Sequence, residues 1–146
     1  MGAMESDDNV VRQIAKAVGS VIVSVEYRLA PEHPFPAALN DCSTALQWLA
    51  DNTDTLAVDP ARIAIGGISA GAGLAAGLAL YVRDKTDITL VFQFLLCPMI
   101  DDRCVTSSSH MITDERVWNR YSNLTAWKNY LQGENDAETA PFDDVS

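Results

Sequence analysis

The sequence predicts an α/β protein in which helices cover both faces of a mostly parallel sheet. Apolar runs rich in β-branched residues alternate along the chain with stretches of helical periodicity, the order of β–α–β units. The chain has 146 residues, 48% of them hydrophobic, which suits one domain with a buried core. Only 8 Gly and 6 Pro are present, so collagen-like and low-complexity chains are excluded. We expect three strands and about four helices.

The first helix and strand are expected over residues 9–18 and 20–27. Apolar residues in the first stretch recur at helical spacing, with Ser6 or Asp7 as the N-cap and Gly19 as the terminating residue. The second stretch contains Val21-Ile22-Val23-Ser24-Val25, which is typical of a strand buried on both faces. A helix followed directly by a buried strand begins the alternating pattern.

A proline-rich segment interrupts the pattern and is followed by a second helix and strand. Pro31, Pro34 and Pro36 exclude a helix or a central strand at their positions. Residues 37–49 show helical spacing, Asp59-Pro60 marks a turn, and residues 62–66 form a short apolar run. The apolar stripe of the helix is expected at five positions. These are Leu39, Cys42, Ala45, Leu46 and Leu49.

The last elements are a small-residue helix over 69–83, a strand over 90–96 and a polar helix over 114–131. The apolar positions of the polar helix are Trp118, Tyr121, Leu124, Trp127 and Tyr130. We therefore divide the chain into one domain over 1–133 and a polar tail over 134–146.

Composition excludes several partners. The formal net charge of −10 argues against nucleic acid and anionic membrane surfaces, which require basic residues. No apolar stretch reaches the length of a membrane span, and the N-terminus has no secretory pattern. Cys42, Cys97 and Cys104 are widely spaced, which indicates reduced thiols in a cytoplasmic protein and neither disulfides nor a metal site. We expect no cofactor and no metal.

One motif carries chemistry: Gly67-Ile68-Ser69-Ala70-Gly71, a G-x-S-x-G between the second predicted strand and the next helix. The turn would hold Ser69 above the carboxyl end of the sheet in a strained conformation, and the flanking glycines would relieve backbone crowding. The helix that follows directs N–H groups at the site, so the amide of Ala70 can donate to a developing oxyanion. The alternative is a small-residue turn that merely lets the helix pack closely on the sheet.

Longer segments extend this motif into a family resemblance. Val23-Ser24-Val25-Glu26-Tyr27-Arg28-Leu29-Ala30-Pro31-Glu32-His33-Pro34-Phe35-Pro36-Ala37-Ala38 resembles the Y-R-L-A-P-E-x-P-F-P-A segment of the hormone-sensitive-lipase-like carboxylesterases. Asp59-Pro60-Ala61-Arg62-Ile63-Ala64, the Ser69 motif and Pro98-Met99-Ile100-Asp101-Asp102-Arg103 follow in the family's order. The resemblance covers about residues 5–133. It implies an α/β-hydrolase fold and hydrolysis of a small-molecule ester through a Ser–His–Asp triad, with Ser69 as the nucleophile. Ile68 departs from the Asp that is usual at its position.

The resemblance also implies which parts of the machinery to expect outside this sequence. The family's H-G-G oxyanion loop precedes a segment that Glu5-Ser6-Asp7-Asp8 resembles, and its triad Asp and His follow on later strands. His33 and His110 are interpreted as structural and surface residues. Asp101 and Asp102 end a strand near the edge of the site and could touch substrate or pair with Arg103, and we expect pairing. We therefore expect a fragment that is inactive or very weak alone.

Two other function classes remain open: a non-catalytic α/β binding or regulatory module, and a nucleotide-binding unit. The second is disfavoured because no G-x-G-x-x-G or Walker pattern follows a strand. The family's strand order places a further strand between the first two strands predicted here. We therefore expect self-association through exposed strand edges. Arg28 is expected to be buried against carboxylates or carbonyls.

Overall fold

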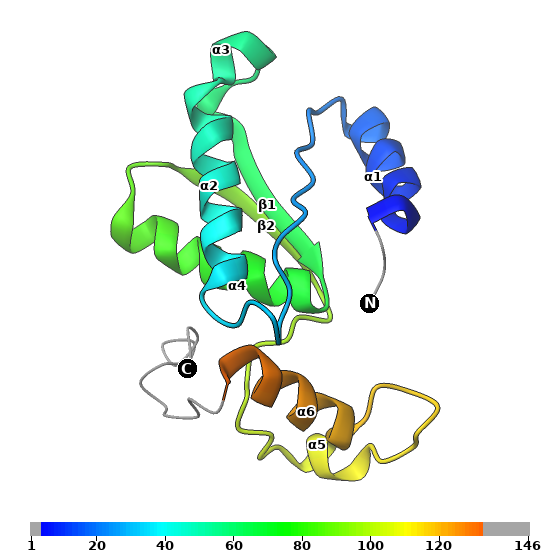
Figure 1. The fold of residues 1–146 in the computed structure, drawn as a ribbon. Helices are drawn as coiled ribbons and strands as arrows, with labels where there is room; N and C mark the ends of the chain where they lie inside the picture. Colours follow the sequence, from blue (N-terminus) through cyan, green and yellow to red (C-terminus); the bar gives the residue numbers. More distant parts are fainter. Residues whose placement is uncertain (1–3, 133–146) are drawn as a thin grey trace.

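The computed structural model describes residues 4–132 and places helices around a small parallel sheet (Figure 1). The elements of this part of the chain are α1 (Met4–Val18), α2 (Ala37–Asp51), α3 (Thr53–Leu56), the 3₁₀-helix η1 (Pro60–Arg62), β1 (Ile63–Ile68), α4 (Ala70–Lys85), β2 (Leu90–Leu96), α5 (Ser107–Met111) and α6 (Arg120–Leu131). The predicted polar tail over 134–146 lies outside the described residues.

The sheet consists of β1 and β2, which pair in parallel as the alternating pattern predicts. Helix α4 connects the two strands and packs on both, and α2 packs against α4. Four buried side chains form the core beneath these helices, namely Leu46, Ile63, Leu78 and Val82. The predicted apolar stripe of α2 is confirmed, because Leu46 is buried and Leu39, Cys42 and Leu49 pack against the same cluster.

The opposite face of this sheet is not covered by the described residues. In the β1–β2 register Ala64 pairs with Phe92, Gly66 with Phe94 and Ile68 with Leu96, so these six side-chain positions share one face. All six residues are exposed. A parallel sheet normally buries both faces, so an apolar surface remains open here.

The predicted strand over residues 20–27 is wrong for the described structure. This segment follows α1 as extended chain without strand pairing, and the sheet has two strands where three were expected. Its apolar residues Val21, Ile22 and Val23 are exposed. A β-branched run favours extended backbone, but a strand requires a neighbour to receive its N–H and C=O groups. No described segment supplies that neighbour.

Both terminal helices differ from expectation at their beginnings. Helix α1 includes Ser6 and Asp7, which were predicted to cap it, and it ends before Gly19, whose φ of 63° confirms the predicted terminator. The predicted helix over 114–131 begins only at Arg120, because Asn119 caps it by accepting a hydrogen bond from the Ser122 amide at 2.9 Å.

The described residues form six α-helices where about four were expected, and α3 and α5 are the short additions.

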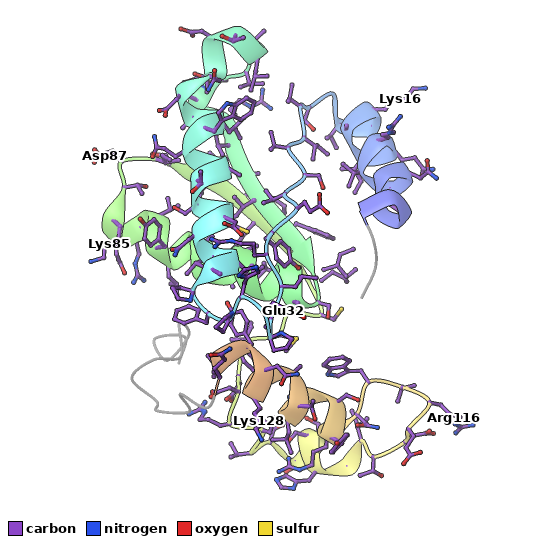
Figure 2. All side chains as sticks on the ribbon, in the orientation of Figure 1. Lys16, Glu32, Lys85, Asp87, Arg116 and Lys128 are labelled. Atoms are coloured by element: carbon purple, nitrogen blue, oxygen red, sulfur yellow. The ribbon has the colours of Figure 1, made fainter. Side chains whose placement is uncertain are left out.

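The proline-rich segment joins the sheet layer to α6. The Phe35 amide donates to the Tyr130 carbonyl at 2.7 Å, and the two rings meet edge to face with centroids 5.8 Å apart. The Gln132 side chain donates to the Pro31 carbonyl at 3.1 Å. Figure 2 shows Glu32 of this segment beside the helix that carries Lys128. The segment therefore holds α6 below the sheet.

Arg28 is paired as predicted but is not buried. Its guanidinium donates to both carboxylate oxygens of Asp41, and its backbone N–H donates to Asp41 Oδ2 at 2.9 Å. The Arg28 side chain is nevertheless 52% exposed, so the expectation of burial is wrong. The pair fastens the beginning of the proline-rich segment to α2 at the protein surface.

Candidate active site

Ser69 lies between the last residue of β1 and the first residue of α4, in a backbone conformation that is costly for a residue with a Cβ. Its φ is 55° and its ψ is −118°, outside the regions that L-residues favour. Such a conformation costs about 1–3 kcal/mol and persists only where the surroundings enforce it.

Four backbone hydrogen bonds enforce the Ser69 conformation. The Ser69 amide donates to the Leu96 carbonyl at 2.9 Å, which continues the β1–β2 ladder by one residue. The Ser69 carbonyl accepts from the amides of Ala72 and Gly73 at 3.1 Å and from that of Met99 at 3.3 Å. The residue is therefore tied to the next strand, to its own helix and to the loop after β2.

The side chain of Ser69 is left available by this arrangement. A serine that precedes a helix commonly caps it through its hydroxyl, but Ser69 makes no capping hydrogen bond to α4. The residue is exposed, and it lines a pocket of about 440 Å³. The other residues that line this pocket are Cys97, Pro98, Met99, Ile100, Asp101, Trp118, Asn123 and Trp127.

The glycines of the motif differ in what the backbone requires of them. A Cβ on Gly67 would lie 2.3 Å from the carbonyl carbon and oxygen of Gly71, so β1 can approach the first turn of α4 only with glycine there. A Cβ on Gly71 would meet nothing within 4 Å. The close approach of β1 to α4 therefore requires glycine at position 67, whereas the described structure shows no such requirement at position 71. Ile68, the unusual residue of the motif, is exposed and faces away from the core.

Ala70 is the first residue of α4. The first N–H groups of a helix have no partner within the helix and carry its partial positive charge. The Ala70 amide therefore lies one residue after Ser69 at the positive end of a 16-residue helix. This is the position that the prediction of an oxyanion donor requires.

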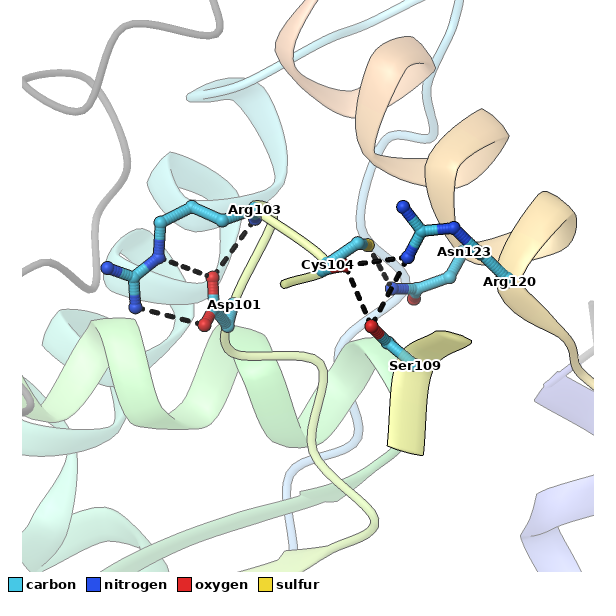
Figure 3. A network of polar contacts seen from close by, with 6 residues as sticks. All are labelled: Asp101, Arg103, Cys104, Ser109, Arg120 and Asn123. Atoms are coloured by element: carbon cyan, nitrogen blue, oxygen red, sulfur yellow. Dashed lines mark hydrogen bonds and ion pairs between the residues drawn. The ribbon is translucent and has the colours of Figure 1, made fainter. Parts of the chain in front are cut away.

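A polar network around Cys104 includes Asn123, which lines the same pocket as Ser69 (Figure 3). Arg120 Nη1 donates to the Cys104 carbonyl at 2.6 Å, and the Ser109 hydroxyl donates to the same carbonyl at 2.7 Å. The Asn123 amide donates to Cys104 Sγ at 2.9 Å, and Asn123 Oδ1 accepts from the Trp118 indole at 3.3 Å. The loop after β2 is thereby fixed to α6, and Trp118 is fixed to Asn123.

The two histidines do not lie at Ser69. His33 is exposed in the proline-rich segment, where its amide donates to the Leu29 carbonyl at 2.9 Å. His110 is exposed on the short helix α5, as expected for a surface residue. Neither contributes to the pocket that Ser69 lines. Asp101 does line it, and it pairs with Arg103 as predicted.

The wall formed by Trp118, Asn123 and Trp127 was not recognised from the sequence. Trp118 and Trp127 were interpreted only as apolar positions of a helix. Nothing in their spacing indicates that the loop after β2 folds α6 back toward Ser69. One sequence feature did indicate this side of the pocket. Asp101 follows a predicted strand whose carboxyl end lies at the same edge of the sheet as that of β1.

The fold and the site are those of an α/β protein with a serine at a strand-to-helix turn. Comparison with known proteins identifies its family. Residues 1–144 match the family model described as the alpha/beta hydrolase fold, and the chain belongs to that family. No helix of the described residues is long and apolar enough to cross a bilayer.

Individual relatives are esterases. The chain is 44% identical over 98 residues to carboxylesterase NlhH of Mycobacterium tuberculosis, covering 67% of this chain and 31% of that protein. It is 38% identical over 100 residues to an arylesterase of Saccharolobus solfataricus, covering 68% of this chain and 32% of that one. The solved structure of a bacterial heroin esterase superposes with a TM-score of 0.89 and 42% identity, covering all of this chain and 45% of the other. The matched part of the chain thus spans 31–45% of these relatives' length.

Proposed function

We propose that this chain carries the nucleophile of a carboxylic ester hydrolase, with Ser69 as that nucleophile and the Ala70 N–H as an oxyanion donor. The observation that carries the proposal is the Ser69 backbone, held at φ 55° with a hydroxyl that does not cap α4 and that borders a pocket. The esterases among its relatives support the class of reaction. The Y-R-L-A-P-E segment supports assignment to the hormone-sensitive-lipase-like branch.

The reaction begins with attack of Ser69 Oγ on the ester carbonyl carbon. The C–O bond to the alcohol then breaks, the alcohol leaves with a proton, and water releases the acid from the acyl-serine. Gly67 allows α4 to lie directly behind the serine, and the Ala70 amide stabilises the negative charge on the carbonyl oxygen.

The proton of Ser69 requires a base. None of the described residues that line the pocket is a histidine, and Asp101 is already engaged by Arg103. Loss of a triad member lowers turnover by several orders of magnitude. We therefore expect the chain alone to hydrolyse activated short-chain esters feebly or not at all.

The absence of a histidine among those residues favours a second candidate, a binding module that holds an ester without cleaving it.

We also propose a cytoplasmic location, because Cys42, Cys97 and Cys104 are free thiols in this structure.

Labelling with a fluorophosphonate separates the two candidates. Ser69 Oγ would displace fluoride and form an O–P bond, which mass spectrometry of the tryptic peptide detects. We expect slow labelling that Ser69→Ala abolishes and that Ser107→Ala leaves unchanged, because Ser107 is an exposed serine on α5. Labelling spread equally over exposed serines would contradict a nucleophilic Ser69.

A further inference from the structure

We propose that the Ser69 pocket selects esters that carry a positive charge, and that Asp101 is the residue that binds the cation. This inference rests on the proposed function, since it names the substrate class of the same site. Three features of the described residues support it: the charge of the pocket wall, the clamp on that charge, and the aromatic surfaces beside it.

The wall of the pocket bears a single kind of charge. Of the described residues that line it, Asp101 alone is charged at neutral pH, and neither a lysine nor an arginine is among them. Most of the remaining wall is apolar, formed by the segment from Cys97 to Ile100 and by two tryptophans. A substrate with an anionic group would meet the carboxylate without a compensating cation.

Arg103 holds the Asp101 carboxylate ionised and in one orientation. Oδ1 accepts from the backbone N–H and from Nε of Arg103, at 3.0 and 2.9 Å, and Oδ2 accepts from Nη2 at 3.0 Å (Figure 3). These hydrogen bonds lower the pKa of Asp101. A carboxylate has about four acceptor positions, two on each oxygen. Three are occupied by Arg103, so Oδ2 can accept one further donor.

The positive charge of Arg103 acts mainly toward solvent and not toward the pocket. Its side chain is 63% exposed, against 36% for Asp101, and it is not among the described residues that line the pocket. Water screens an exposed guanidinium more strongly than a partly covered carboxylate. A ligand at Ser69 therefore experiences Asp101 more than its partner.

Two indole rings share the pocket with the carboxylate. Trp118 and Trp127 line the same pocket, and the hydrogen bond from the Trp118 indole to Asn123 limits the rotation of that ring. Indole is the most favourable aromatic group for binding ammonium ions. The net charge of −10 adds a long-range attraction for cationic ligands.

Two phosphonofluoridate probes of equal shape test the proposal. One carries a 2-(trimethylammonio)ethyl group and the other its neutral carbon analogue, 3,3-dimethylbutyl. We expect Ser69 to react with the cationic probe roughly tenfold faster at low salt, and we expect Asp101→Asn to remove most of this preference. The matched control is Asp114→Asn, because Asp114 is clamped by Arg116 in the same i, i+2 geometry and is not among the described residues that line the pocket.

A binding measurement separates this inference from the proposed function. Tetramethylammonium should change tryptophan fluorescence in the unmodified chain and in Asp114→Asn, but much less in Asp101→Asn. If neither probe labels Ser69 and this Asp101-dependent binding persists, the nucleophile proposal fails and the cation site stands. Equal reaction of Ser69 with both probes would overturn the cation site and keep the nucleophile. A chain that neither reacts nor binds tetramethylammonium would overturn both.

Discussion

The α-helix after Ser69 and the loop after β2 meet at Gly73 and Met99, where a Cβ on the glycine would lie 2.3 Å from the Met99 carbonyl oxygen. That carbonyl belongs to backbone, and the Met99 amide is hydrogen-bonded to Ser69, so the loop cannot retreat without loosening the serine. We expect Gly73→Ala to destabilise the fold by about 2 kcal/mol or more. Denaturant unfolding measures this loss.

Gly71→Ala is the matched control for this substitution. The two glycines lie two residues apart in α4, but a Cβ on Gly71 would meet nothing within 4 Å. Alanine favours helix over glycine by up to about 1 kcal/mol, so this variant should be as stable as the parent or more so. Equal destabilisation by both alanines would show that helix propensity and not the Met99 contact controls the loss.

The backbone of Ser69 predicts that the residue lowers the stability of the chain. Glycine adopts φ 55° and ψ −118° without the steric cost that a Cβ imposes. We expect Ser69→Gly to raise the free energy of unfolding by about 1 kcal/mol, after allowance for the greater freedom of glycine in the unfolded chain. Ser69→Ala keeps the Cβ and should change little. A lower urea midpoint for Ser69→Gly than for Ser69→Ala would contradict a strained serine.

The ion pair of Arg28 and Asp41 predicts a pH dependence of stability. Hydrogen bonds from the Arg28 side chain and backbone N–H lower the pKa of Asp41 to about 2. A depressed carboxyl pKa contributes stability that is present above the unfolded-state value, near 4, and is lost as the pH falls toward 2. Asp41→Asn should therefore remove part of the decrease in stability between about pH 4 and pH 2. Carboxyl NMR titration of Asp41 checks the pKa, and a value near 4 would contradict the pairing.

Local patterns predicted the elements whose partners are close in sequence. Helices α2 and α4 and strand β2 lie within a few residues of their predicted bounds, because helical and strand periodicity are read over one turn or a few residues. The segment over 20–27 has the composition of a strand but no described neighbour, and pairing cannot be inferred from one strand alone. Helix α6 begins later than predicted because Asn119 caps it, although the apolar pattern begins earlier in the sequence.

In the candidate site, too, only the residues that are close together in sequence were predicted. Gly67, Ser69 and Ala70 lie within four residues of one another, and their strand-to-helix context was sufficient to predict their location at the end of β1 and the start of α4. Trp118 and Asn123 reach the pocket through the network around Cys104, which depends on the path of the loop after β2. No periodicity encodes that path. Gly73 was likewise interpreted as part of a small-residue helix, whereas its contact with Met99 requires the folded loop.

The uncovered face of the β1–β2 sheet predicts self-association. Phe92 is 63% exposed and Phe94 48% exposed, and Ile68 and Leu96 lie beside them on the same face. Sequence reasoning placed the association at strand edges, and the structure adds this apolar surface. Together these four side chains expose on the order of 400 Å² of apolar surface, which is in the range of the largest patches on monomeric proteins.

We expect a second copy of the chain to cover this face, giving a reversible dimer or larger species at micromolar concentration in sedimentation experiments. The net charge of −10 on each copy opposes contact, so added salt should strengthen the association. Phe92→Lys should weaken it, because a charge would then lie in the contact. Trp48→Lys is the control, since Trp48 is 50% exposed but lies on α2, which packs on the other side of the sheet layer. A monomer at all salt concentrations, or equal weakening by both lysines, would contradict association through this face.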